Sequence, residues 1–174
     1  MNSIEKSEDQ INESSNIEEN NQKNRNSNLN DNYIYDEFLD QGFEILHQNY
    51  KYDHCFKIIF IGDSGVGKTS ITCKITSGKF FEQPSPTVGF ELFPFMVKYK
   101  GKIIKLEIWD ICGQEVYRSL IKSFFINSSM AILTYSISDR KTFESISEWI
   151  IECRNYCSPN TRFILIGNKK DLGK

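Results

Sequence analysis

The residues with the clearest chemical potential form a glycine-rich segment, Gly62-Asp63-Ser64-Gly65-Val66-Gly67-Lys68-Thr69. Its order matches the pattern G-x-x-x-x-G-K-[ST], in which glycines let backbone N–H groups wrap around phosphate oxygens. Lys68 would bring a positive charge to the outer phosphates, and the Thr69 hydroxyl is a suitable Mg²⁺ ligand. An apolar run from Cys55 to Ile61 precedes the segment, and helical spacing from Thr69 to Ser77 follows it. This context favours a phosphate-binding loop over a chance glycine turn.

A second polar segment, Asn168-Lys169-Lys170-Asp171, directly follows a buried-type strand from Phe163 to Gly167. It resembles the N-K-x-D signature of guanine-nucleotide-binding proteins. In that signature the Asp carboxylate accepts hydrogen bonds from guanine N1 and the exocyclic amine, while the Asn contacts the base and the Lys stem covers the ring. Taken alone, four polar residues would indicate a simple turn. Their position after a strand and a phosphate loop favours a guanine site.

A third segment, Asp110-Ile111-Cys112-Gly113-Gln114-Glu115, begins where a predicted strand ends. Asp110 could hold Mg²⁺ through a water molecule, and the Gly113 N–H could bond to the outermost phosphate. Gln114 could orient a water molecule for attack on that phosphate. The alternative, an ordinary acidic residue in a turn, is plausible only without the other two segments.

The elements that must position these segments alternate between strand-like and helix-like patterns. Strands are expected over residues 55–61, 90–99, 103–110, 130–137 and 163–167, and helices over 69–77, 116–125 and 140–156. This alternation predicts an α/β fold with a mostly parallel sheet, one antiparallel edge strand and helices on both faces. Lys100-Gly101 predicts a hairpin turn, and Pro94 predicts that the first hairpin strand lies at the sheet edge.

The N-terminal part of the 174-residue chain has a different composition. Residues 1–50 carry 11 acidic and 3 basic side chains, and residues 1–32 include ten asparagines with few aliphatics. Such a segment buries too little apolar surface to offset its ordering entropy, so residues 1–32 are predicted to be a disordered tail. Apolar residues then recur at helical spacing, which predicts a short amphipathic helix within residues 33–50; they are Tyr35, Leu39, Phe43, Leu46 and Tyr50.

Composition excludes several classes of protein. Five cysteines without a C-x-x-C pair, and only two histidines, argue against a zinc site or a secreted disulfide framework. The acidic N-terminal segment argues against nucleic acid as a partner. No run of about 18 apolar residues is present, so no transmembrane segment is expected. The chain also lacks a C-terminal cysteine for prenylation. A cytoplasmic setting is expected.

From Cys55 to Leu172 the chain resembles the Ras superfamily of small GTPases, and specifically its Rab branch. Three stretches carry the resemblance: GDSGVGKTS, KLEIWDICGQE and FFINSSMAILTYSISDRKTFESISEWI. The Arf branch has a second glycine where Cys112 stands and fits poorly. The resemblance implies a P-loop NTPase fold that binds GTP and GDP with Mg²⁺.

Carried over residue by residue, the resemblance assigns roles to the motif positions. Thr87 would ligate Mg²⁺ and sense the γ-phosphate, and Phe80 would pack against the guanine. The predicted nucleotide-binding residues are Asp63, Ser64, Gly65, Val66, Gly67, Lys68, Thr69, Ser70, Phe80, Thr87, Gly113, Asn168, Lys169 and Asp171. The predicted Mg²⁺ residues are Thr69, Thr87 and Asp110, and the predicted catalytic residues are Gln114 and Lys68. Phe90, Trp109 and Tyr117 would form an exposed aromatic cluster that binds effectors.

The resemblance also implies a monomeric switch in vesicle traffic, peripheral on endomembranes through an exchange factor, a GTPase-activating protein and effectors. Family members continue beyond N-K-x-D with a further strand and helices, so residues 51–174 are expected to be an incomplete, C-terminally truncated GTPase domain. The alternatives are a non-catalytic interaction module or an unstable fragment that binds no nucleotide. Docking of residues 33–50 on the uncovered sheet face is a further possibility.

Overall fold

The structure, a computed structural model, describes residues 42–80, 85–114 and 122–172. The chain divides into two units, residues 1–43 and 44–174, and the described elements lie almost wholly in the second. In chain order these elements are β1 (Phe43–Leu46), β2 (His54–Ile61), α2 (Lys68–Ser77), β3 (Phe90–Tyr99), β4 (Lys102–Ile111), the 3₁₀ turn η2 (Lys122–Phe125), β5 (Met130–Ser136), α4 (Arg140–Glu144), α5 (Ile146–Tyr156), β6 (Arg162–Asn168) and the 3₁₀ turn η3 (Lys170–Leu172). None of the helices in this described part is long and apolar enough to cross a membrane.

The strands form one six-stranded sheet in the order β1-β3-β4-β2-β5-β6. β2 is parallel to β4 and β5, and β5 is parallel to β6, whereas β3 is antiparallel to β4. The β3–β4 hairpin turns at Lys100 and Gly101, whose φ angles are both positive, 47° and 75°. The predicted α/β fold with a mostly parallel sheet is therefore confirmed. Its parallel strands align their carboxyl ends, so that Phe60 of β2 pairs with Asp110 of β4.

Pro94 predicted that strand β3 lies at the outer edge of the sheet. The structure instead places β1 beyond β3, at the edge. A proline removes only the N–H group at its own position. β1 has 4 residues and β3 has 10, so β1 can pair with only part of that strand. The antiparallel hairpin at this side of the sheet is as predicted, and the short β1 is an addition.

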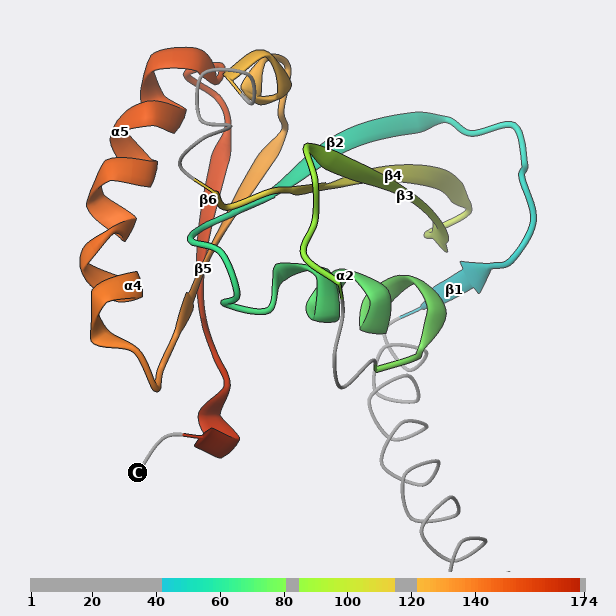
Figure 1. Cartoon of the computed structure of the whole chain (residues 1–174). Coiled ribbons are helices and arrows are strands. Elements are labelled where there is room, and N and C mark those ends of the chain that lie inside the picture. Colours follow the sequence, from blue (N-terminus) through green and yellow to red (C-terminus); the bar gives the residue numbers. More distant parts are fainter. Residues whose placement is uncertain (1–41, 81–84, 115–121, 173–174) are drawn as a thin grey trace, which may run out of the picture. The chain divides into compact units, whose positions relative to one another are not determined.

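Alternating residues of β2 build two apolar layers, one on each face of the sheet. Ile59 and Ile61 belong to a core cluster with Trp149 and Cys153 of α5. Phe60 points to the opposite face, where Ile71 of α2 packs against its cluster. Helices therefore cover both faces, as predicted, with α4 and α5 on one and α2 on the other (Figure 1).

The helix predicted over residues 33–50 is wrong for the part that the structure describes, since Phe43–Leu46 forms strand β1. Gly42 has a φ of 78°, a left-handed conformation that a right-handed helix does not accommodate. Gly42 weakens the helix preference of this short apolar segment. Pairing with the sheet then determines its conformation. Residues 33–41 and the predicted tail, 1–32, lie outside the described residues.

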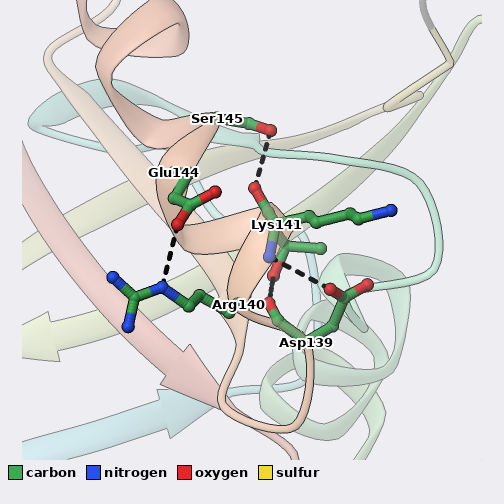
Figure 2. Close-up of polar contacts among 6 residues, drawn as sticks. Asp139, Arg140, Lys141, Glu144 and Ser145 are labelled. Atoms are coloured by element: carbon green, nitrogen blue, oxygen red, sulfur yellow. Dashed lines mark hydrogen bonds and ion pairs between the residues drawn. The ribbon is translucent and has the colours of Figure 1, made fainter.

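The helix predicted over residues 140–156 is divided into α4 and α5 at Ser145. Figure 2 shows the local bonds: the Asp139 carboxylate accepts from the Lys141 N–H at 3.1 Å, and the Ser145 hydroxyl donates to the Lys141 carbonyl at 2.9 Å. Arg140 and Glu144 form an exposed ion pair along the same short helix (Figure 2). Asp139 thus caps the start of α4, and the serine side chain competes with the backbone ladder where α4 ends.

Candidate nucleotide-binding site

A cavity of about 510 Å³ lies at the carboxyl ends of the parallel strands. This is where open α/β sheets place their ligands. Segments from four regions of the chain meet there: the phosphate loop with α2, the loop before β3, the end of β4 and the end of β6. The lining residues are Ser64, Gly65, Gly67, Lys68, Thr69, Ser70, Phe80, Ser85, Pro86, Thr87, Cys112, Gly113, Asn168, Lys169, Asp171 and Leu172.

Lys68 opens helix α2 and is held over the phosphate loop. Its ammonium group donates to the Gly62 carbonyl at 2.9 Å and to the Asp63 carbonyl at 2.8 Å. The side chain is only 6% exposed, and this burial lowers the pKa of Lys68 to about 8, against the opposing charge of Asp110. A buried cation at a helix N-terminus gives this end of the cavity a strong preference for anions.

Three oxygen-bearing side chains converge beside Lys68. The Thr69 hydroxyl donates to Oδ2 of Asp110 at 2.5 Å and lies 2.9 Å from the Thr87 hydroxyl. The Thr87 hydroxyl in turn donates to the same carboxylate oxygen at 3.3 Å. Burial raises the pKa of Asp110, and the hydrogen bond from Thr69 acts in the opposite direction.

The second oxygen of Asp110, Oδ1, is buried and has no hydrogen-bond partner among the described residues. A buried carboxylate oxygen without a hydrogen bond carries a desolvation cost, which a hydrogen-bond donor or a cation would offset. Hydroxyl and carboxylate oxygens are ligands that Mg²⁺ prefers. The donor set of Thr69, Thr87 and Asp110 therefore fits this cation.

Gly113 follows β4 and passes very close to the phosphate loop. A Cβ atom at this position would lie 2.4 Å from the Gly62 carbonyl oxygen and 2.5 Å from the Ser64 nitrogen. Only a glycine allows the two backbones to approach so closely. Gly113 lines the cavity, whereas Gln114, which the structure also describes, is not among the lining residues.

The opposite end of the cavity is formed by the last residue of β6 and by turn η3. The Asn168 amide donates to the Val66 carbonyl at 2.8 Å, so this segment is tied to the phosphate loop. Asp171 is exposed within η3, and Phe80 is 65% exposed at the cavity border. The structure thus brings the two predicted motifs into one site, at its two ends.

Two predicted binding residues have structural roles instead of lining the cavity. Val66 is buried and presents its carbonyl to Asn168. Asp63 accepts a hydrogen bond at 2.8 Å from the indole N–H of Trp149, a fully buried residue of α5. Sequence reasoning missed Trp149 as a support of the phosphate loop. The available signal was its helical spacing with Ile146 and Cys153, which indicates burial but not a partner.

An aromatic cluster lies where β3, β4 and η2 meet. Phe90 stacks on Trp109 with ring centroids 4.9 Å apart, and Phe124 contacts both, at 4.3 Å from Phe90 and 5.6 Å from Trp109. Phe90 is 42% exposed. Phe90 and Trp109 were predicted to lie together, whereas Phe124 was not assigned to the cluster, and Tyr117 lies outside the described residues.

Comparison with known proteins identifies the family. A model described as the Ras family matches residues 57–174. The chain is 39% identical over 121 residues to the Ras-related protein RABA1b of Arabidopsis thaliana and 37% identical over 121 residues to the Ras-related protein RIC2 of Oryza sativa subsp. japonica. Each alignment covers 70% of this chain and 56% of the relative, so the chain spans about half the length of the curated relatives it matches. Because the family model covers most of the chain, and relatives with Rab names are about 38% identical over 70% of it, the chain belongs to the Ras family as a Rab-type small GTPase.

Proposed function

We propose that this chain binds GTP and GDP with Mg²⁺, hydrolyses GTP, and serves as a switch in vesicle traffic. One observation carries the proposal: four segments that are separate in sequence line a single cavity, with a buried lysine at one end and an Asn-Lys-x-Asp segment at the other. Membership of the Ras family supports it further, because the relatives include Ras-related proteins with Rab names, such as RABA1b.

The phosphate end would hold the β- and γ-phosphates through the backbone N–H groups of Gly65 to Thr69 and the Lys68 ammonium. The Lys68 ammonium now donates its N–H groups to the Gly62 and Asp63 carbonyl oxygens. Phosphate oxygens would accept from the same N–H groups. Thr69 and Thr87 would ligate the cation directly, with Asp110 reaching it through water. Mg²⁺ bound there would neutralise charge that develops on the phosphates.

Gln114 would orient the water molecule that attacks the γ-phosphate, and Gly113 would donate its N–H to that phosphate. Positioning and charge stabilisation account for most catalysis in phosphoryl transfer, so few further groups are required. No arginine lines the cavity in the part of the chain that the structure describes. Intrinsic turnover is therefore slow, and a GTPase-activating protein would supply the missing charge.

The switch would work through the aromatic cluster. Phe90 lies three residues after Thr87, and Trp109 directly precedes Asp110. Both contacts of the γ-phosphate site, Thr87 and Gly113, therefore connect along the backbone to the stacked rings. Loss of the γ-phosphate would release these segments and change the surface that effectors read. Exchange factors would act on the same region, and the chain would be a cytoplasmic monomer that reaches endomembranes through such partners.

Titration of the purified 174-residue chain with a fluorescent GDP analogue tests binding, first with Mg²⁺ and then with excess EDTA. We expect saturable binding that weakens when the cation is removed. A folded chain that shows no saturable binding would overturn the proposal. Single-turnover hydrolysis of GTP, compared with Gln114→Leu, tests catalysis: binding without any Gln114-dependent hydrolysis would instead favour the non-catalytic interaction module.

A further inference from the structure

A close contact between β5 and β6 lies directly behind the base end of the cavity. Gly167 precedes Asn168 in β6 and is paired with Tyr135 of β5. A Cβ atom at position 167 would lie 2.7 Å from the Tyr135 hydroxyl oxygen, 2.9 Å from its Cζ atom and 3.1 Å from Cγ1 of Ile137. Gly167 is not among the glycines with positive φ. Glycine is therefore required here by the space that the Tyr135 ring occupies, and not by backbone conformation.

The Tyr135 ring is held in place on its other sides. It packs against the core cluster that α5 shares with the sheet. Phe143 of α4 contacts the ring edge-on, with the ring centroids 5.0 Å apart and an angle of 64° between the ring planes. An aromatic ring has few rotamers, so it can leave position 167 only by losing these contacts. We therefore expect a side chain at position 167 to displace the end of β6 and not the ring.

The next residue, Asn168, is fixed by hydrogen bonds on two sides. Its carbonyl accepts from the Ile137 N–H at 2.8 Å, and its side-chain amide donates to the Val66 carbonyl at 2.8 Å. The turn that carries Ile137 is itself tied to α4, because the buried Thr142 hydroxyl accepts from the Ser136 N–H at 2.9 Å. The turn between β5 and α4 thus holds the main chain where β6 ends.

The contacts with β6 come from residues that do not line the cavity. Tyr135, Ile137 and Phe143 are absent from its lining, whereas Asn168 and Asp171 belong to it. Only three residues separate Asn168 from Asp171 in turn η3, so a shift at the end of β6 would move both. Recognition by hydrogen bonds depends on placing such groups to within a fraction of an ångström.

We propose that Tyr135 is a positioning residue for base recognition. Its ring, seated against Gly167, fixes the end of β6 so that Asn168 and Asp171 meet the edge of the guanine base. The inference rests on the proposed function, because it concerns the same site, and it adds a side chain that does not touch the nucleotide. The contact sets the preference for guanine over a base without the exocyclic amine. Binding of the phosphates and Mg²⁺ depends on the opposite end of the cavity.

The variant Gly167→Ala tests the contact directly. Competition of unlabelled GDP and IDP against a fluorescent GDP analogue gives the ratio of the two affinities. We expect this ratio to fall about fivefold to tenfold in Gly167→Ala, the equivalent of about one hydrogen bond. The loss of affinity on adding EDTA should stay as in the wild-type chain, because the cation end is untouched. Urea unfolding shows whether the variant is folded.

A second substitution in the same pair separates this contact from a general loss of stability. Tyr135→Leu removes both ring atoms that the new Cβ would meet most closely. Alone it should lower the ratio only about twofold, and adding Gly167→Ala should then have little further effect. If Gly167→Ala lowers the ratio equally in both backgrounds, the Tyr135 ring does not position the base end, and the proposal is wrong.

Phe143→Ala provides a test that leaves position 167 unchanged. Phe143 is 50% exposed, so its loss should leave the chain folded while removing the edge contact that holds the Tyr135 ring. The ratio should fall about twofold, the order of one aromatic contact, and should not change in Ile151→Ala, a matched residue of α5 that is 60% exposed. Equal ratios in Phe143→Ala and Ile151→Ala would contradict the proposal.

The outcomes also distinguish this inference from the proposed function. A folded wild-type chain without saturable GDP binding would overturn both. Wild-type binding that shows no preference for GDP over IDP, or a preference that a folded Gly167→Ala chain retains in full, would overturn the role of Tyr135 alone.

Discussion

At the phosphate end of the cavity, Lys68 is 6% exposed and Asp110 is 0% exposed, whereas Phe80 at the base end is 65% exposed. The phosphate end is also held together by bonds between different segments, from Thr69 to Asp110 and from Trp149 to Asp63. At the base end, the bond from Asn168 to Val66 ties the segment to the phosphate loop. The side chains of the phosphate end are therefore buried in the fold, whereas those of the base end are exposed on its surface.

This difference indicates that the phosphate end would contribute mainly to affinity and the base end mainly to specificity. Groups that are already buried and oriented lose little further freedom when a ligand binds, so they contribute most to affinity. If the chain binds a nucleotide as proposed, exposed groups such as Asp171 would become ordered and covered only with the base in place. They would contribute less affinity but would distinguish one base from another, because a wrong base leaves polar groups unpaired.

The largest effect should come from the phosphate end. Replacing Lys68 with alanine removes a cation facing the phosphates, which should weaken GDP binding by about 2–5 kcal/mol, or roughly 30-fold to several thousand-fold. Titration with fluorescent GDP measures this, and Lys79→Ala, an exposed lysine that does not line the cavity, should bind normally. If Lys68→Ala binds as tightly as Lys79→Ala, affinity does not reside in the enclosed half.

A smaller but more selective effect should follow from Asp171→Ala at the base end. Losing hydrogen bonds to a carboxylate should cost about 1.5–3 kcal/mol of GDP affinity. IDP lacks the exocyclic amine of guanine, so competition between GDP and IDP reports whether that amine is read. We expect the preference for GDP to disappear in Asp171→Ala and to persist in Lys170→Ala, whose side chain does not line the cavity. A preference retained in Asp171→Ala would assign base recognition elsewhere.

The third prediction concerns the support of the phosphate end from α5. The coupling between Trp149 and Asp63, measured by urea unfolding of Trp149→Phe, Asp63→Ala and the double variant, should be about 1–2 kcal/mol. The double variant isolates the indole–carboxylate bond from the loss of ring volume. Zero coupling would mean that the 2.8 Å bond does not stabilise the phosphate loop.

The features of the site also differ in how far they could be predicted from the sequence. Lys68, Thr69 and Asp171 could be predicted because each stands in a short contiguous motif, and because parallel strands bring their carboxyl ends to one edge. The bond between Trp149 and Asp63 joins residues 86 positions apart, and helical spacing indicates only that Trp149 is buried. Strand β1 was missed for a related reason: its conformation depends on a partner strand, which a local pattern does not specify.

The smallest expected effect concerns the hydrogen bond from Asn168 to Val66, which joins the two ends of the site. Two glycines of the phosphate loop provide a matched pair of variants to test it. Gly65 and Gly67 both have positive φ, 74° and 97°, so alanine at either position should cost about 1–2 kcal/mol in backbone strain. Only at Gly67 would the new Cβ meet a neighbour, since it would lie 2.2 Å from the Asn168 amide nitrogen, whereas at Gly65 it meets nothing within 4 Å.

Gly67→Ala should therefore displace the Asn168 side chain from the Val66 carbonyl and cost about 0.5–1.5 kcal/mol more GDP affinity than Gly65→Ala. Adding Asn168→Ala separates strain from the lost bond. Asn168→Ala should cost less in Gly67→Ala, where the bond to Val66 is already broken and only the contact with the base is lost, than in Gly65→Ala, where both are lost. If Asn168→Ala costs the same in both backgrounds, the Asn168–Val66 bond does not couple the halves. The enclosed phosphate end and the open base end would then bind the nucleotide independently.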